Sequence, residues 1–323
     1  MSGADAPDLS RTGGLQRLAD RTSSGVFAVC AAVTLLTTLA IFLTLLDSSL
    51  EFFATVAITD FLTGVDWSPN PSGGAQLFGI VPLLIGTLTV TITAALVAIP
   101  IGTLTAIYLS EYASPRLRAI LKPMLEILAG IPTVVYGYFA FVYVTPLLQA
   151  TLFPGLKTFN ALSASLMIGI MTIPMVSSIS EDAMTAVPDH LRNAGYGLGA
   201  TKYQVSTSVV VPASISGIFS SYILAVSRAI GETMIVVVAM GSQAQMPAVR
   251  DAAFGIPYVH PGDVLLEPGM TITVAMVNIA RSDLTGGTIP YDAMFALGLA
   301  LFAVTLVLNV LSDLVAERYR EVY

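Results

Sequence analysis

Six apolar runs of membrane length constrain this chain more than any other feature. A helix of about 20 apolar residues crosses the hydrocarbon core of a bilayer and satisfies all of its own backbone groups there. Only 11% of the 323 residues are charged, against about 25% in a typical soluble domain. The sequence therefore predicts an all-α integral membrane protein with six transmembrane helices, and the runs are Val26–Leu46, Phe78–Leu109, Met124–Leu148, Leu162–Ile179, Ala213–Met240 and Tyr291–Leu311.

The basic residues lie mainly on one side of these six crossings. The N-terminal segment and the connection after the second run hold three each, and the 181–212 segment and the C-terminus hold two each. Lys157, Arg250 and Arg281 fall on the other side. Because positive charge accumulates in cytoplasmic loops, we expect a multi-pass plasma membrane protein with both termini in the cytoplasm. The first run is longer than a signal peptide requires, so we expect a retained anchor.

These crossings divide the chain into four parts. Residues 1–24 form a cytoplasmic tail, and residues 25–77 form the first transmembrane helix with its outer loop. A transmembrane core of residues 78–315 contains a cytoplasmic loop at 181–212, and residues 316–323 form a second tail.

The 181–212 loop has the pattern of a short helix, a bend and a second short helix. A proline followed by an acid favours a helix start at Pro188–Asp189, because the acid faces the positive end of the helix dipole. Three glycines then weaken that helix by roughly 1 kcal/mol each relative to alanine. The side chains of Thr201 and Gln204 have the spacing of a capping box for the second helix. The glycines are Gly195, Gly197 and Gly199.

This loop resembles the permease signature of bacterial and archaeal ABC importers, Glu-Ala-Ala, three residues, Gly, nine residues, Ile-x-Leu-Pro. The spacing is kept at every position, while Asn193 replaces the leading glutamate and so calls into question its usual ion pair with the ATPase. The resemblance implies an ATPase-docking surface in the loop. Its matching positions are Asn193, Ala194, Gly195, Gly199, Val209, Val211 and Pro212, and the docking residues expected are Asn193, Ala194, Gly195, Leu198, Gly199, Ala200 and Pro212.

The fifth run contains two opposite charges, Arg228 and Glu232. An arginine in the middle of a span costs about 2.5–3.5 kcal/mol on insertion scales, so it needs a partner or a function. Four residues apart on one helix, the two side chains would share a face and pair. They form either a structural pair inside the bundle or part of an anion path, since guanidinium suits bidentate contact with a tetrahedral oxyanion. We favour the path, to which Ser227 and Thr233 add hydroxyls.

Three further motifs resemble the phosphate ABC importer permeases: Ala106–Tyr112, Glu126–Gly137 and Ser227–Met234. The Phe78-Gly79-Ile80-x-Pro82 entry to the second run is more similar to the PstC type than to its paralogue PstA. The resemblance implies the type I ABC importer permease fold and a phosphate path through Arg228 and Glu232. It also implies a PstA-like second permease, PstB-like ATPase subunits that hold ATP and Mg, and a PstS-like extracytoplasmic phosphate-binding protein.

The sequence lacks the motifs expected of a nucleotide-hydrolysing or metal-binding protein. It has no GxxxxGK[ST] loop, so we expect a non-catalytic subunit without its own cofactor, driven by a separate ATPase. His190, His260 and the single Cys30 lack ligand spacing, so neither a metal site nor a disulfide is expected. We expect contact with membrane lipid and none with nucleic acid. The alternatives are a permease for sulfate, molybdate or phosphonate, a secondary transporter or channel, and a membrane enzyme.

Overall fold

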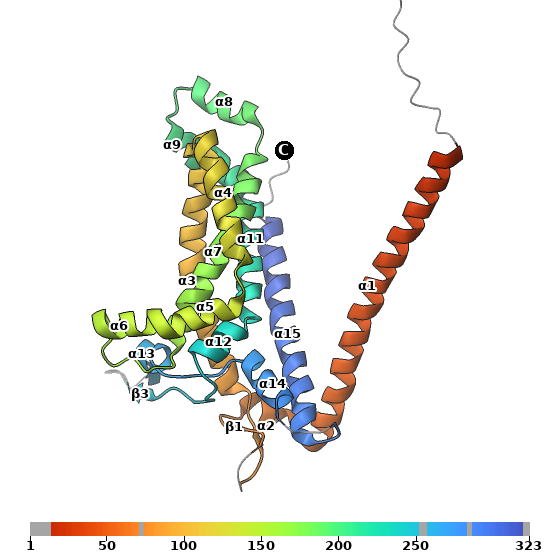
Figure 1. Ribbon diagram of the computed structural model, residues 1–323, viewed down its shortest axis with the longest axis vertical. Coiled ribbons are helices and arrows are strands. Elements are labelled where there is room, and N and C mark those ends of the chain that lie inside the picture. The colour runs from red at the N-terminus through yellow and green to blue at the C-terminus, as the bar shows by residue number, and fades with distance from the viewer. Residues whose placement is uncertain (1–13, 71–73, 252–256, 283–285, 319–323) are drawn as a thin grey trace, which may run out of the picture.

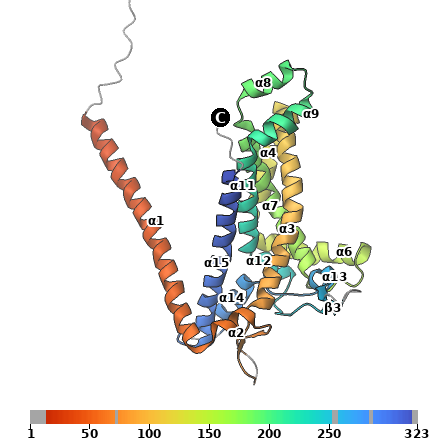
Figure 2. The same cartoon turned by 180° about the vertical axis from the view of Figure 1, so that it is seen from behind.

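The computed structural model describes residues 14–70, 74–251, 257–282 and 286–318. Helices dominate it, and most of them run along one long axis (Figure 1). Three parts of the chain lie toward one end of the molecule: the start of α1 (Gly14–Thr55), the helices α8 (Asp189–Gly197) and α9 (Lys202–Val205), and the end of α15 (Ile289–Arg318). The helices α2 and α14 lie at the opposite end, and Figure 2 shows the same separation from behind. We name these the docking end and the outer end.

Five helices within the described residues are long and apolar enough to cross a membrane. A sixth span results if the stretch Lys202–Ala213 is joined to α11 (Ile215–Ile230), from which it bends by 70°. The prediction of an all-helical membrane protein is thus confirmed, with five candidate spans, or six if this bent pair is counted as one. The five are Thr22–Thr55 of α1, Val81–Tyr112, Thr133–Thr151, α7 (Ala161–Thr185) and Ile289–Leu311 of α15.

The third apolar run does not form one continuous helix. Helix α4 (Pro115–Gly130) ends before Ile131–Pro132, and α5 (Thr133–Phe139) then begins. A π-helical turn, Ala140–Val144, connects α5 to α6 (Thr145–Thr151), and α5 and α6 run crosswise to α3 and α7 (Figure 1). Proline disfavours a helical residue before it, which explains the break. The predicted third span, Met124–Leu148, is therefore divided: residues up to Gly130 belong to α4, and the candidate span is Thr133–Thr151.

The fifth run is also interrupted. Helix α11 ends at Ile230, and α12 (Met234–Ala239) begins after the three residues Gly231–Thr233. Glycine has the weakest preference for helix apart from proline, so Gly231 gives the chain a place to leave the helix. The break separates Arg228, in the last turn of α11, from Glu232, which lies in the connection.

Helices α3 (Val81–Ile107) and α7 form the centre of the bundle. Their backbones come close at two glycines: a Cβ added at Gly169 would lie 3.0 Å from the Ala94 carbonyl oxygen, and one at Gly102 would lie 2.6 Å from Val176 Cβ. Small residues at helix contacts are the usual means of tight packing in membranes, where lipid gives no hydrophobic drive for association. A π-helical turn, Tyr108–Tyr112, extends α3 toward the docking end.

Aromatic side chains hold the outer end together. Helix α2 (Ile58–Thr63) and the antiparallel pair β1 (Trp67–Ser68) and β2 (Leu77–Phe78) pack against the end of α1. The Phe52 ring is fully buried and meets three others at centroid distances of 5.2 to 5.6 Å. We name this the outer aromatic cluster, and it consists of Phe52, Phe53, Phe61, Trp67 and Phe78.

The long segment before α15 folds against the outer end of the bundle. It contains α13 (Pro261–Leu265), α14 (Ile272–Ala280) and the antiparallel pair β3 (Val249–Asp251) and β4 (Pro257–Val259). Helix α14 is buried along most of its length, and the Thr87 hydroxyl of α3 accepts a hydrogen bond of 3.1 Å from the Ile272 amide. The apolar stretch Met270–Ile279 is therefore covered by protein.

Candidate docking surface and anion path

Residues 189–213, which we name the docking segment, have the predicted helix, bend and helix. Helix α8 (Asp189–Gly197) is followed by α9 (Lys202–Val205), a π-helical turn Ser206–Val210 and α10 (Val211–Ala213). The capping box is present: the Thr201 hydroxyl accepts from the Gln204 amide at 3.3 Å, and the Gln204 side chain accepts from the Thr201 amide at 2.8 Å. This prediction is confirmed at the level of individual atoms.

Gly199 ends α8 in a left-handed conformation with φ of 82°. Its amide donates to the Tyr196 carbonyl at 2.9 Å, and the Ala200 amide donates to the Gly195 carbonyl at 3.1 Å. These two bonds form a Schellman motif, which needs a residue of positive φ directly after the helix cap. A Cβ at Gly199 would meet nothing within 4 Å. The position therefore favours glycine for its backbone conformation, not for packing within this chain.

The structure brings six of the seven expected docking residues together at the end of α8, with the seventh further along the segment. Asn193, Ala194, Leu198 and Gly199 are exposed, and Leu198 is exposed to 91%. Gly195 and Ala200 are half-buried, and Pro212 is exposed in α10. This exposure leaves the Leu198 side chain available to a partner.

Arg192 attaches the inner face of α8 to the transmembrane bundle. Its guanidinium donates to the Met184 carbonyl at 2.7 Å, to the Val187 carbonyl, to a Glu111 carboxylate oxygen at 3.2 Å and to Asp189 at 3.4 Å. The side chain of Glu111 is 5% exposed and that of Asp189 is 92% exposed. The buried contact joins the docking segment to the π-helical turn after α3.

A second charged group joins α4 to α7. The side chain of Glu181 is only 3% exposed and pairs with both Arg118 and Lys122 of α4. Lys122 also pairs with the exposed Asp182 at 2.9 Å. Hydrogen bonds to Glu181 and then to Asp182 raise the pKa of Lys122 above its usual value, so the ammonium remains charged at physiological pH. This group was not found from sequence, although the spacing of Arg118 and Lys122 on one helix face was available.

The two membrane charges do not pair. Glu232 is 7% exposed, and its carboxylate accepts from the amides of Met234 at 3.1 Å and Ile235 at 3.3 Å, capping the start of α12. Arg228 is exposed on α11 and meets the Met171 sulfur at 3.7 Å. Among the described residues, no carboxylate forms an ion pair with it. The prediction of a pair on one helix face is wrong, because the chain leaves the helix at Gly231.

Of the two expected hydroxyls, that of Ser227 lies in α11 before this break and that of Thr233 lies within it. The Ser227 hydroxyl donates to the Asn309 side chain of α15 at 3.1 Å, and the Thr233 hydroxyl donates to the Gly231 carbonyl at 3.3 Å. The backbone carbonyl of Glu232 is in turn bonded by the Thr273 hydroxyl of α14 at 3.0 Å. The connection between α11 and α12 is therefore held by a polar contact from α14, and the end of α11 by one from α15.

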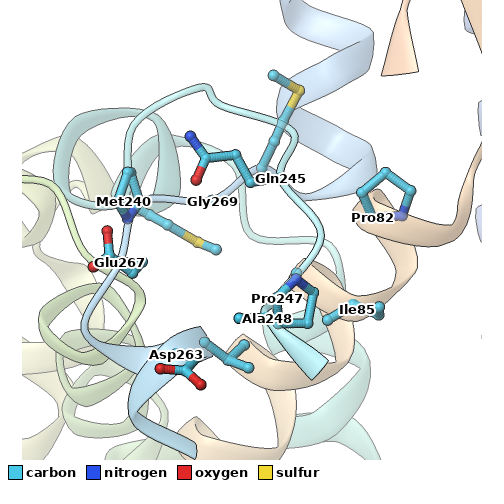
Figure 3. A pocket seen from close by; sticks show the side chains of 13 residues that line it. Pro82, Ile85, Met240, Gln245, Pro247, Ala248, Asp263, Glu267 and Gly269 are labelled. Carbon is cyan, nitrogen blue, oxygen red and sulfur yellow. The ribbon is translucent and has the colours of Figure 1, made fainter. Parts of the chain in front are cut away.

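A pocket of about 270 Å³ opens at the outer end (Figure 3). Arg228 is not among the residues that line it. Asp263 and Glu267 lie on one side of it, and Pro82 and Ile85 lie on the other. Two carboxylates disfavour an anion in this pocket. The positive group suited to an oxyanion is Arg228, which does not line it.

The arrangement defines a membrane transport protein with a docking segment on one side. Residues 98–321 match the family of binding-protein-dependent transport system inner membrane components. The chain belongs to this family.

Similar proteins agree with this assignment. The chain is 30% identical to the phosphate transport system permease protein PstC of Haemophilus influenzae, over 81% of this chain and 82% of that one. It is 28% identical to a probable ABC transporter permease protein, YqgH, of Bacillus subtilis, over 91% and 89%. A bacterial ABC transporter that imports the acidic polysaccharide alginate covers 94% of this chain and all of its own, with a TM-score of 0.62 at 13% identity. The fold is that of the type I ABC importer permeases.

Proposed function

We propose that this chain is the PstC-type permease subunit of an ATP-driven importer of inorganic phosphate. The observation that carries the proposal is the state of Arg228. Its guanidinium is exposed on a broken membrane helix and has no carboxylate partner among the described residues, so its donors are available to an anion. The similarity to PstC permeases supports phosphate as that anion.

The position of Glu232 supports the proposed role of Arg228. Glu232 is four residues from Arg228 in the sequence, but its carboxylate is directed to the first amides of α12. An acid at a helix start is stabilised by the partial positive charge of the unpaired amides. Glu232 therefore shapes the broken span, while Arg228 supplies the positive charge that the anion meets.

The partners and orientation follow from the same proposal. A PstA-like permease completes the path, PstB-like ATPases that bind ATP and Mg dock on the α8 tip, and a PstS-like binding protein delivers phosphate at the outer end. The docking end then faces the cytoplasm, and both termini are cytoplasmic. The basic residues Arg118, Lys122, Arg192 and Lys202 at that end support this orientation.

The substitution Arg228→Gln tests the proposed path. We expect the rate of phosphate uptake by the assembled transporter to fall about tenfold to hundredfold, because a hydrogen bond to a charged group is worth about 1.5–3 kcal/mol. Arg281→Gln, the same change at an exposed arginine of the outer end, should leave uptake unchanged. Radiolabelled phosphate uptake in proteoliposomes measures both, with copurification of the ATPase as the check on assembly. Wild-type uptake by Arg228→Gln would refute the path.

Other oxyanions are the nearest alternative cargo. Sulfate and molybdate offer the same tetrahedral oxygens to a guanidinium, so Arg228 does not distinguish them. Competition by unlabelled sulfate or molybdate against labelled phosphate decides the question in the same proteoliposomes. Equal competition by either anion would replace phosphate with an oxyanion of broader specificity.

A further inference from the structure

The motif Leu109-Ser110-Glu111-Tyr112 has no role in the path or on the exposed docking tip. It forms the π-helical turn that ends the second span, where Leu109 is 1% exposed. Turns of this kind occur mostly as local insertions within helices and frequently mark functional sites. Here the turn lies between the bundle and the docking segment.

Two cations of the docking segment contact adjacent residues of this turn. Arg192 of α8 pairs with Glu111 at 3.2 Å, and the Lys202 ammonium of α9 lies 5.1 Å from the centre of the Tyr112 ring. The Glu111 oxygen that Arg192 meets also accepts the Ser110 hydroxyl at 3.0 Å. One turn thus contacts both short helices of the docking segment. It meets α8 through an ion pair and α9 through a cation–π contact.

The Glu111 contact is the more constrained of the two. The side chains of Glu111 and Arg192 are 5% and 15% exposed, so water screens them less than it screens a surface pair. The same guanidinium also donates to the carbonyls of Met184 and Val187 at the end of α7. A displacement of α8 therefore acts on the ends of the second and fourth spans at once.

We propose that Glu111 and Tyr112 are positioning residues that transmit movement of the docking segment to the second span. The inference rests on the proposed ATP-driven function. Nucleotide-driven displacement of α8 and α9 reaches α3 through the Glu111–Arg192 ion pair and the Lys202–Tyr112 contact. Without them the ATPase still docks on the exposed tip and hydrolyses ATP, but less of that work reaches the transmembrane helices.

The first test measures phosphate imported per ATP hydrolysed by the transporter assembled with its ATPase and second permease. Glu111→Gln removes the buried charge and retains the shape of the side chain, and we expect the ratio to fall about fivefold to tenfold, which is the lower end of the usual coupling between two sites. Asp182→Asn removes an exposed carboxylate of α7 that pairs with Lys122 alone within the described part of the chain, and it should retain the wild-type ratio. Equal ratios in wild type and Glu111→Gln would overturn the role of Glu111.

A matched pair of variants tests the contact between Lys202 and the Tyr112 ring. Tyr112→Leu removes the aromatic face and should lower the ratio, by less than Glu111→Gln because the ring is 41% exposed. Tyr112→Phe keeps the face and should retain the ratio. An equal fall in both variants would show that the hydroxyl, and not a cation–π contact, is what matters.

A second readout separates this inference from the proposed function. A nitroxide spin label at Tyr196→Cys, with Cys30→Ser, reports the mobility of α8 without substrate or nucleotide. Glu111→Gln should increase the mobility of that label and Asp182→Asn should not. If wild-type transporter imports no phosphate with ATP, the proposed function fails, and the label still decides whether Glu111 holds α8. If the label is no more mobile in Glu111→Gln than in wild type, Glu111 does not attach α8 to the bundle.

Discussion

The two ends of the molecule are held together by different physical interactions. All ion pairs found among the described residues lie at the docking end, where they connect α4, α7, α8 and the turn after α3. The outer end is held by buried aromatic rings and by the packing of α14. Apolar packing loses much energy for a small displacement, whereas charged contacts tolerate a change of geometry and depend on solvent. The difference suits an end that moves and an end that stays fixed.

The largest effect is expected in the outer aromatic cluster. Phe52→Ala removes a fully buried ring that meets three others, and we expect the free energy of unfolding to fall by about 3–5 kcal/mol. Phe27→Ala, at a ring of α1 that is 70% exposed in this chain, should have a much smaller effect. Thermal unfolding in detergent measures both. Similar losses would mean that the cluster is not what stabilises the outer end.

An intermediate effect is expected at the buried carboxylate of the docking end. Glu181→Gln leaves Arg118 and Lys122 facing a neutral amide, and a loss of about 2 kcal/mol is expected from the charged hydrogen bonds that it weakens. Asp182→Asn, whose side chain is 69% exposed, should change stability by less than about 0.5 kcal/mol. The same unfolding assay at low and high salt compares the two. Equal effects would contradict a distinction based on burial.

The smallest effect is expected at the tip of the docking segment. Gly199→Ala forces a side chain into positive φ and should destabilise α8 by about 1 kcal/mol. Gly197→Ala changes the last residue of α8, where a Cβ meets nothing within 4 Å, and should stabilise the helix by up to about 1 kcal/mol. Hydrogen exchange of the α8 amides gives the sign of each change. A stabilising Gly199→Ala would mean that the Schellman motif does not form.

Local patterns predicted the docking segment well. The capping box at Thr201 and Gln204 and the helix start at Pro188–Asp189 depend on contacts within a few residues, so the sequence carries all the information they need. The apolar runs likewise identified a membrane protein, because length and composition alone decide whether a helix can cross a bilayer. The resemblance of the loop to the signature of ABC importer permeases then indicated the protein family.

Contacts between distant segments were not predictable in the same way. Glu181 was assigned to a loop, but α7 continues to Thr185 and buries it against α4. The pairing of Arg228 with Glu232 assumed a continuous helix, and one glycine was enough to end it. Similarly, Ile131–Pro132 divides the third apolar run into α4 and α5. Composition measures how apolar a span is, but where it breaks depends on single residues.

The break after α11 has one more consequence, for how cargo leaves the protein. Glu232 directs its carboxylate to the backbone of α12, and Arg228 is the one basic side chain of α11 and α12, close to the gap in the span. In the proposed role, a divalent oxyanion there would be attracted but not fully neutralised. Passage requires a resting place that is favourable enough to enter and weak enough to leave. A single guanidinium meets both conditions, where a cluster of cations would retain the anion.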